Sequence, residues 1–211
     1  MRVWDLPTRL FHWSLASLAV FSVVTAKAGG NWLQWHFWSG YALLALLLFR
    51  VLWGVAGDRY ARFAQFVRGP SAVLAYLRGR ADGGAGHNPL GALSVLAILA
   101  ALLLQAGTGL FANDAIFSEG PLAKLVSQAT SDRSTAIHKW NEPVLYALAG
   151  LHVAAVAYYA LLRRRPMIGP MITGDRRGES APPARDDAAM RLRALILMIV
   201  AAGLTAYVVR L

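Results

Sequence analysis

Five long apolar stretches alternate with polar and basic segments along the chain. They cover residues 10–28, 35–55, 89–111, 137–162 and 192–209. A helix needs about 20 mostly apolar residues to cross a bilayer, and each stretch meets or approaches that length. Because none of them alternates apolar and polar residues as a membrane β-strand does, the pattern predicts five transmembrane helices.

The composition agrees with that pattern. Of the 211 residues, 57% are hydrophobic and only 15% are charged, and the mean hydropathy is +0.46, values outside the usual range of soluble domains. We therefore predict an all-α membrane protein with a four-helix transmembrane bundle over residues 1–165. Residues 166–190, rich in proline and arginine, are predicted as a cytoplasmic linker, and residues 191–211 as an additional, peripheral transmembrane helix.

The net charge of +10 is concentrated in three segments rather than spread along the chain. Arginines gather before the first apolar stretch, between the second and third, and between the fourth and fifth, whereas the other loops are nearly neutral. This asymmetry is typical of the positive-inside rule and argues against a nucleic-acid surface. We expect the N-terminus on the cytoplasmic side and the C-terminus on the periplasmic side.

The first apolar stretch imitates a cleavable signal peptide. It has a basic start and ends in Ala26-Lys27-Ala28, which resembles a cleavage site. However, the apolar run is long and contains His12 and Trp13. We therefore expect it to be retained as the first helix.

Several kinds of chemistry are excluded. Cysteine is absent, which rules out disulfides, thiolate-bound iron–sulfur clusters and covalently attached haem. The sequence also lacks a P-loop, a dinucleotide-binding glycine fingerprint and the His-Glu-x-x-His zinc motif. Any cofactor must therefore be held by histidine, methionine or oxygen ligands.

Four of the five histidines fall at matching depths in the predicted helices. His138 and His152 are fourteen residues apart, which corresponds to a rise of about 21 Å and a return to nearly the same helix face. His36 lies near the outer end of the second helix, as His138 does in the fourth. His12 lies as deep in the first helix as His152 does in the fourth. The sequence thus predicts an outer pair, His36 with His138, and an inner pair, His12 with His152.

Two imidazoles at one depth on facing helices can bind a haem iron from both sides. The two pairs therefore indicate two non-covalent b-type haems with these four histidines as iron ligands. The alternative is that each histidine is a buried polar residue hydrogen-bonded to a neighbouring helix. A zinc site fits less well, because zinc takes three or four ligands together.

His87 is the remaining histidine, and it lies at the predicted inner surface just before the third helix. Three interpretations stay open for it. It has no function, or it contacts a haem propionate or a quinone headgroup, or it replaces His12 as the inner ligand.

Other residues fit a cofactor site. Gly40 follows His36 by one turn and leaves room for a flat macrocycle, although small residues also serve ordinary packing between membrane helices. Arg9, Arg50 and Lys139 are candidates to pair with haem propionates near the two surfaces. Snorkelling to the membrane surface is the alternative for each of these cations.

Three further segments allow predictions about helix packing, a docking loop and interfacial helices. Gly107 and Gly109 permit close approach of a helix or a cofactor. The polar outer loop that begins at Asp114 is long enough to form a docking surface. The aromatic and basic residues between 58 and 82 suit short helices that lie in the membrane interface rather than cross it.

The sequence resembles the bacterial cytochrome b561 family, which includes the b-type cytochrome subunits of nickel–iron hydrogenases. The resemblance covers about residues 2–165. It rests on the four histidines of the pairs and on the segments VWDLPTRLFHW, HFWSGYALLALLLFRVLWGVAGDRYARF, HNPLGALSVL and TGLFANDAIFSEGPL. It implies a four-helix bundle with two haem b groups, ligands from the first, second and fourth helices, and electron exchange with membrane quinone. By the family pattern, His12 and His152 bind the inner haem, and His36 and His138 the outer one.

The resemblance also implies a role in a bacterial respiratory chain at the cell inner membrane. We expect single-electron transport between the quinone pool and a periplasmic redox partner, either a c-type cytochrome or a dehydrogenase or hydrogenase subunit. Two alternatives remain: a superoxide:quinone oxidoreductase, and a helical membrane protein without redox function. Membrane lipid surrounds the chain, a homodimer is conceivable, and the direction of electron flow is open.

Overall fold

The computed structural model of the chain describes residues 1–80, 84, 86–115, 118–176 and 181–211. Parts of the segment 58–82, of the loop after Asp114 and of the linker fall outside these ranges. The long helices are α1 (Leu6–Ala28), α2 (Leu33–Ala56), α5 (Pro89–Gly109), α6 (Gln128–Ala157) and α8 (Ala188–Val208). The short ones are η1 (Gly30–Trp32), α3 (Phe63–Phe66), α4 (Pro70–Leu77), η2 (Ala123–Leu125), the π-helical η3 (Tyr158–Leu162) and α7 (Ile168–Thr173).

The prediction of an all-helical, multi-pass membrane chain is confirmed. Five helical segments of the described chain are long and apolar enough to cross a membrane: 6–28, 30–56, 89–109, 128–162 and 188–208. The described residues form no strand and only two isolated β-bridges, Arg2 with Asp175 and Asn113 with Glu119. Between the second and third crossings lie the short helices α3 and α4, as expected for a segment that does not cross.

Side-chain caps fix where the long helices begin. Asp5 caps α1 by accepting a hydrogen bond from the backbone N–H of Thr8 at 2.7 Å, and Asn88 caps α5 in the same way. Ser127 caps α6, whose first residue, Gln128, lies nine residues before the predicted start of the fourth helix at residue 137. The difference arises because the predicted start marked the apolar run, whereas the cap begins a helix whose first turns are polar.

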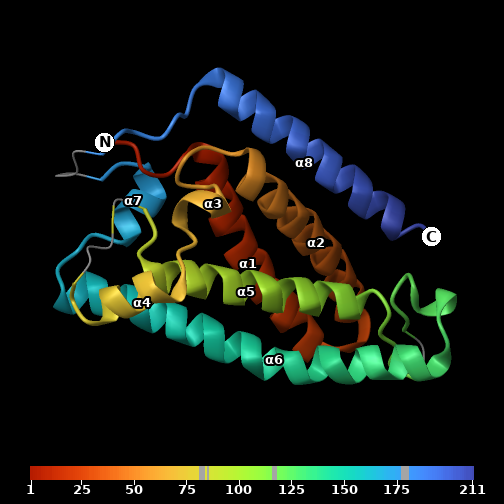
Figure 1. Cartoon of the computed structure of the whole chain (residues 1–211). Helices are drawn as coiled ribbons and strands as arrows, with labels where there is room; N and C mark the ends of the chain where they lie inside the picture. Colours follow the sequence, from red (N-terminus) through yellow and green to blue (C-terminus); the bar gives the residue numbers. More distant parts are fainter. Residues whose placement is uncertain (81–83, 85, 116–117, 177–180) are drawn as a thin grey trace.

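Helix α2 lies at the centre of the packing. It packs along α1, α5 and α8, and α5 in turn packs along α6 (Figure 1). Trp53 of α2 is fully buried, and its indole N–H donates to the hydroxyl of Thr8 on α1 at 3.2 Å. Helix α8 packs against α2, and its Met190, Ala194 and Ala201 belong to the buried core; its peripheral role stays a prediction.

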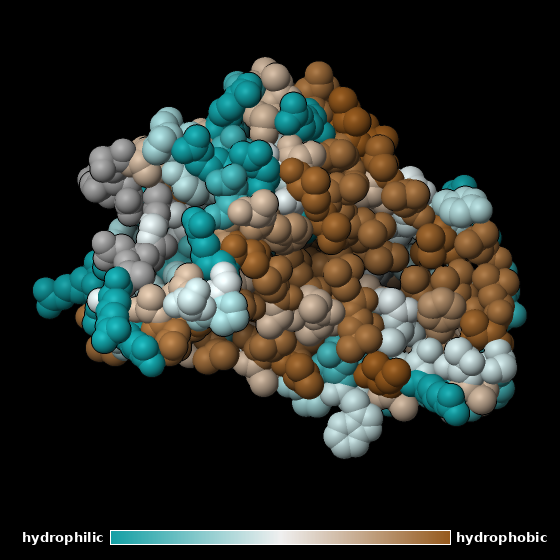
Figure 2. Space-filling model, viewed as in Figure 1, coloured by the Kyte–Doolittle hydropathy of each residue, from teal (hydrophilic) through white to brown (hydrophobic). Residues whose placement is uncertain are grey.

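Apolar side chains cover much of the outer surface of the long helices (Figure 2). Val55 of α2, Leu161 at the end of the α6 crossing and Ile199 of α8 are each more than 60% exposed. Exposed apolar surface on this scale is unfavourable in water. It suits helices that are surrounded by lipid.

The N-terminal segment and the linker meet at one end of the molecule, which we call the basic end and which also carries residues 57–80. Met1, Val3 and Trp4 form backbone hydrogen bonds with Gly174 and Arg176. Figure 1 shows the N-terminus beside α7 and far from the C-terminus. The linker thus folds back on the start of the chain instead of extending away from it.

Asp186 joins these segments at the basic end. Its carboxylate pairs with Arg2 and Arg191, lies 3.9 Å from Arg9, and accepts the backbone N–H of Leu6 at 3.3 Å. Burial alone would raise the pKa of Asp186, but the hydrogen bonds from Arg191 and Leu6 and the nearby positive charges outweigh it, and the pKa lies below its usual value of 3.8. The charged form of Asp186 therefore stabilises the fold.

Replacing this carboxylate will loosen the basic end. For Asp186→Asn we expect a lower thermal unfolding temperature at pH 7, because several charge-assisted hydrogen bonds weaken together. A group with a lowered pKa stabilises above its unfolded pKa and loses that effect as the pH falls through its folded pKa. The difference between wild type and variant should therefore persist above about pH 4 and fade below it.

Asp175→Asn is the matched control, because Asp175 pairs with the same Arg2 but is half exposed. Exposed ion pairs contribute at most about 1 kcal/mol, so this variant should unfold close to the wild-type temperature. Equal effects of the two substitutions would contradict the role assigned to Asp186.

Candidate functional site

The structure brings the two inner histidines face to face. His12 lies in the second turn of α1 and His152 near the inner end of α6, and their ring centres are 6.3 Å apart with the planes tilted by 50°. Nδ1 of His12 is buried and has no hydrogen-bond partner among the described residues. The ring of His12 therefore faces that of His152, and the role of His12 as the inner ligand stays a prediction.

The two outer histidines face each other in the same way. His36 in the first turn of α2 and His138 in α6 have ring centres 6.2 Å apart, with nearly perpendicular planes. Nδ1 of His36 lies 2.9 Å from the backbone carbonyl of Ser22, and Nδ1 of His138 lies 2.9 Å from that of Gln105. A carbonyl accepts only from N–H, so Nδ1 of each ring is the protonated nitrogen and Nε2 is left with its lone pair.

These separations fit one metal ion between each pair. Metal–imidazole bonds are about 2 Å long, so two rings on opposite sides of one ion have their centres about 6 Å apart. The described residues contain no group of three or more histidines, carboxylates or cysteines that could hold a metal. The histidines thus occur as pairs, which fits a haem iron that takes four ligands from its macrocycle and two from the protein.

The helices that carry the pairs leave room between them. Extensive packing joins α1 to α2 and α5 to α6, but the described parts of α1 and α6 do not pack closely along each other. A methyl group added at Gly40 of α2 or at Gly150 of α6 would meet no atom within 4 Å. The role of Gly40 in clearance for a macrocycle stays a prediction.

Asn141 and Gly109 fix α6 against α5 at the outer pair. The amide of Asn141 is buried and donates to the backbone carbonyl of Ala101 at 2.9 Å and to Gln105 Oε1 at 2.7 Å. A Cβ at Gly109 would lie 3.0 Å from Cε1 of His138. Gly109 therefore allows the close approach predicted for it, whereas Gly107 faces open space.

Two buried polar groups near the inner pair lack partners within the described chain. Arg50 of α2 is 3% exposed, its Nη1 makes no hydrogen bond, and its guanidinium lies 4.7 Å from the centre of the Phe63 ring. His87 packs between Trp4 and Phe66, with its Nδ1 buried and unpaired. Burial first, and then the positive charge of Arg50, lowers the pKa of His87 to about 3. An unsatisfied buried guanidinium N–H is costly, so the surroundings of Arg50 are suited to an anionic group such as a carboxylate, whereas His87 is neutral.

The other two cations proposed for propionates lie in different surroundings. Arg9 donates to the backbone carbonyl of Ile172 in the linker and approaches Asp186, while its Nε is buried without a partner. Lys139 is exposed on α6 at the outer end. Arg9 thus binds the linker in part, and Lys139 points away from the packed interior.

Some of these features have a signal in the sequence and others do not. Arg50 follows His36 by fourteen residues, the same interval as between His138 and His152, so it lies on the same face of α2 at the inner level. The burial of His87 was missed, because the covering N-terminal segment and α3 are distant in sequence. The carbonyls of Ser22 and Gln105 were also missed, since a backbone acceptor leaves no mark in the residue types.

The fold and the paired histidines define a class of protein: a multi-pass helical membrane protein built to hold a metal-containing cofactor between its helices. Residues 3–174 match the sequence profile of the family described as prokaryotic cytochrome b561, which is more than half of the chain, so the chain belongs to this family. The family resemblance predicted from the sequence is thereby confirmed. No curated protein and no solved structure matches the chain. The protein is thus a haem b-binding membrane cytochrome of electron transfer.

The contact between Gly109 and His138 can be tested by adding one methyl group. For Gly109→Ala we expect overpacking against the imidazole, at a cost of about 1–3 kcal/mol, together with a changed Soret or α band as His138 is displaced. Gly107→Ala is the control, because its methyl group meets open space. Thermal unfolding and visible spectra of the two purified variants measure the effects, and identical behaviour of both would contradict this account of Gly109.

Proposed function

We propose that this cytochrome carries single electrons across the membrane between the quinone pool and a redox protein on the periplasmic side. In this proposal His12 and His152 bind an inner haem b, and His36 and His138 bind an outer one. The observation that carries the proposal is the pair of facing imidazole couples, with ring centres 6.3 and 6.2 Å apart, on one shared helix. A haem iron with two imidazole ligands is coordinatively saturated and supplies outer-sphere one-electron transfer.

The chain's own groups hold the imidazoles in one tautomer. At the outer pair, Nδ1–H of each ring donates to a backbone carbonyl, which fixes the ring and leaves Nε2 free to bind a metal ion. Backbone carbonyls at fixed positions in α1 and α5 cannot follow a moving side chain. The outer ligands are therefore oriented before any cofactor binds.

The spacing along α6 sets the depth of the two sites. His138 and His152 are separated by fourteen residues, or about 21 Å of helix rise. The hydrocarbon core of a bilayer is about 30 Å thick. Two sites at this separation reach most of the way across it, which supports electron transfer from one surface to the other.

Positive groups favour the inner site for haem carboxylates. Nη1 of Arg50 and Nε of Arg9 are buried without partners there. Propionates would satisfy these donors and compensate the buried charge of Arg50. Lys139 has the corresponding place near the outer surface, where water screens it, so its contribution should be smaller.

The charge distribution supports the orientation. The basic end carries the N-terminus, residues 57–80 and the linker, and the positive-inside rule assigns such an end to the cytoplasm of a bacterial inner membrane. The opposite end offers the ordered start of the outer loop, where Asn113 binds Thr135 and Ser131 of α6. A partner that docks there would lie close to the outer histidine pair.

Removing one histidine at a time tests the pairing. We expect His12→Ala and His152→Ala each to lose the same haem, and His36→Ala and His138→Ala each to lose the other, because one imidazole cannot hold the bis-ligated iron. The haem-to-protein ratio should fall from two to about one, and a redox titration by visible spectroscopy should show which component remains. His87→Ala is the control and should keep both haems; loss of a haem in that variant alone would contradict the assigned pairs.

Stopped-flow reduction tests the direction and the partner class. With the purified two-haem protein, a quinol or a reduced c-type cytochrome should reduce the haems rapidly, and the reaction with superoxide should be slow. Fast reduction by superoxide, weakened by Lys139→Gln, would instead favour the superoxide:quinone oxidoreductase alternative. The absence of a Soret band in the purified protein would contradict both.

A further inference from the structure

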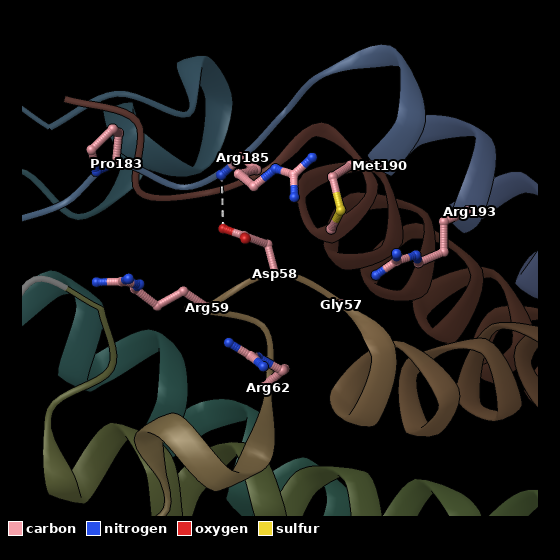
Figure 3. A pocket seen from close by; sticks show the side chains of 8 residues that line it. All are labelled: Gly57, Asp58, Arg59, Arg62, Pro183, Arg185, Met190 and Arg193. Carbon is pink, nitrogen blue, oxygen red and sulfur yellow. Dashed lines mark hydrogen bonds between the residues drawn. The ribbon is translucent and has the colours of Figure 1, made fainter.

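A polar cavity of about 290 Å³ lies at the basic end, under the first turns of α8. Figure 3 shows that three separate parts of the chain form it: the end of α2 with the loop that follows, the end of the linker, and α8. Neither the paired histidines nor Arg50 and His87 line it. The cavity is therefore separate from the proposed electron-transfer site.

The charge of the lining is strongly unbalanced. Four arginines, Arg59, Arg62, Arg185 and Arg193, line the cavity, with Asp58 as the one carboxylate. Asp58 accepts the backbone N–H of Arg185 at 2.8 Å rather than pairing with a guanidinium. The cavity thus concentrates positive charge that no carboxylate in its lining neutralises.

The side chains of three of these arginines differ in their contacts. Arg185 pairs with Asp187 at 2.9 Å and is partly neutralised. Arg62 makes no side-chain hydrogen bond within the described chain, and its Nε is buried. Arg193 donates one N–H to the carbonyl of Ala56 at 3.2 Å, which holds the side chain over the cavity (Figure 3). Arg62 and Arg193 therefore line the cavity from two separate parts of the chain, and neither pairs with a carboxylate of the described residues.

The position of the cavity relative to the membrane indicates the source of that anion. The cavity begins where α2 ends. Met190, which is buried, and Arg193, which is exposed, belong to the first two turns of α8. Just beyond it on the apolar side lie the exposed side chains of Val55 and Ile196. An anionic head bound in the cavity can therefore leave acyl chains along the lipid-facing surfaces of α2 and α8.

We propose that this cavity binds the phosphate of an anionic phospholipid. Guanidinium groups bind phosphate oxygens with paired, charge-assisted hydrogen bonds, and basic pockets between membrane helices on the cytoplasmic side bind acidic headgroups. Residues 183–193 lie beyond the part of the chain that matches the cytochrome b561 family, residues 3–174. The fifth helix and the end of the linker thus add a lipid site to the region that matches the family, and the site stands whether or not the haem assignment does.

Native mass spectrometry of the purified, haem-loaded protein tests the proposal. The probes are dioctanoylphosphatidylglycerol, dioctanoylphosphatidylcholine and inorganic phosphate, each titrated separately. We expect wild type to bind the anionic lipid more tightly than the zwitterionic one, and Arg62→Gln/Arg193→Gln to bind it about tenfold or more weakly. Arg68→Gln/Arg78→Gln is the matched control: it removes two exposed arginines of the same end that do not line the cavity, and it should bind like wild type.

A second pair of measurements guards against misfolding. Arg62→Lys/Arg193→Lys keeps the charge and should retain part of the affinity, and the Soret band and unfolding temperature of every variant should match wild type without lipid. Equal lipid affinity in the glutamine variant and its control would overturn the site. Inorganic phosphate that binds as tightly as phosphatidylglycerol would overturn the lipid as its source, and equal binding of the two lipids would overturn recognition of the anion.

Discussion

The arrangement of this protein depends on two pairs of imidazole rings that face each other between the helices. The ring centres of the two pairs are 6.2 and 6.3 Å apart, and α6 makes few contacts with α1 or α2. The helices that carry the rings therefore cannot gain stability by packing directly against each other along those faces. Stability must come from the other faces of the same helices.

Helix α2 supplies much of that stability. It packs against α1, α5 and α8, and the buried core centres on its residues Leu47, Phe49 and Trp53. Hydrogen bonds replace hydrophobic packing where the interior is polar: Asn141 joins α6 to α5, and Trp53 joins α2 to α1. In the hydrocarbon core a few such bonds contribute to stability, because a polar group left unpaired there cannot form a hydrogen bond with water.

The sequence predicts the crossings and the levels of the histidines well, because both follow from helix geometry. Apolar length gives the spans, and counting residues from helix ends puts His12 beside His152 and His36 beside His138; their role as ligands stays a prediction. The sequence is silent where contacts join distant segments. Net positive charge identifies the basic end, but it does not predict that Asp186 pairs with both Arg2 and Arg191. It also does not predict that Phe63 lies so close to Gly54 that a Cβ at Gly54 would overlap the Phe63 ring.

The contacts at the basic end also determine when this end can fold during synthesis. Arg2 binds Asp175 and Asp186, partners more than 170 residues later in the chain, and synthesis proceeds from the N-terminus. These contacts form only after the linker has emerged, when α1, α2, α5 and α6 already exist. The start of α1, next to His12, therefore stays uncovered through most of translation, and the basic end is the last part of the molecule to fold.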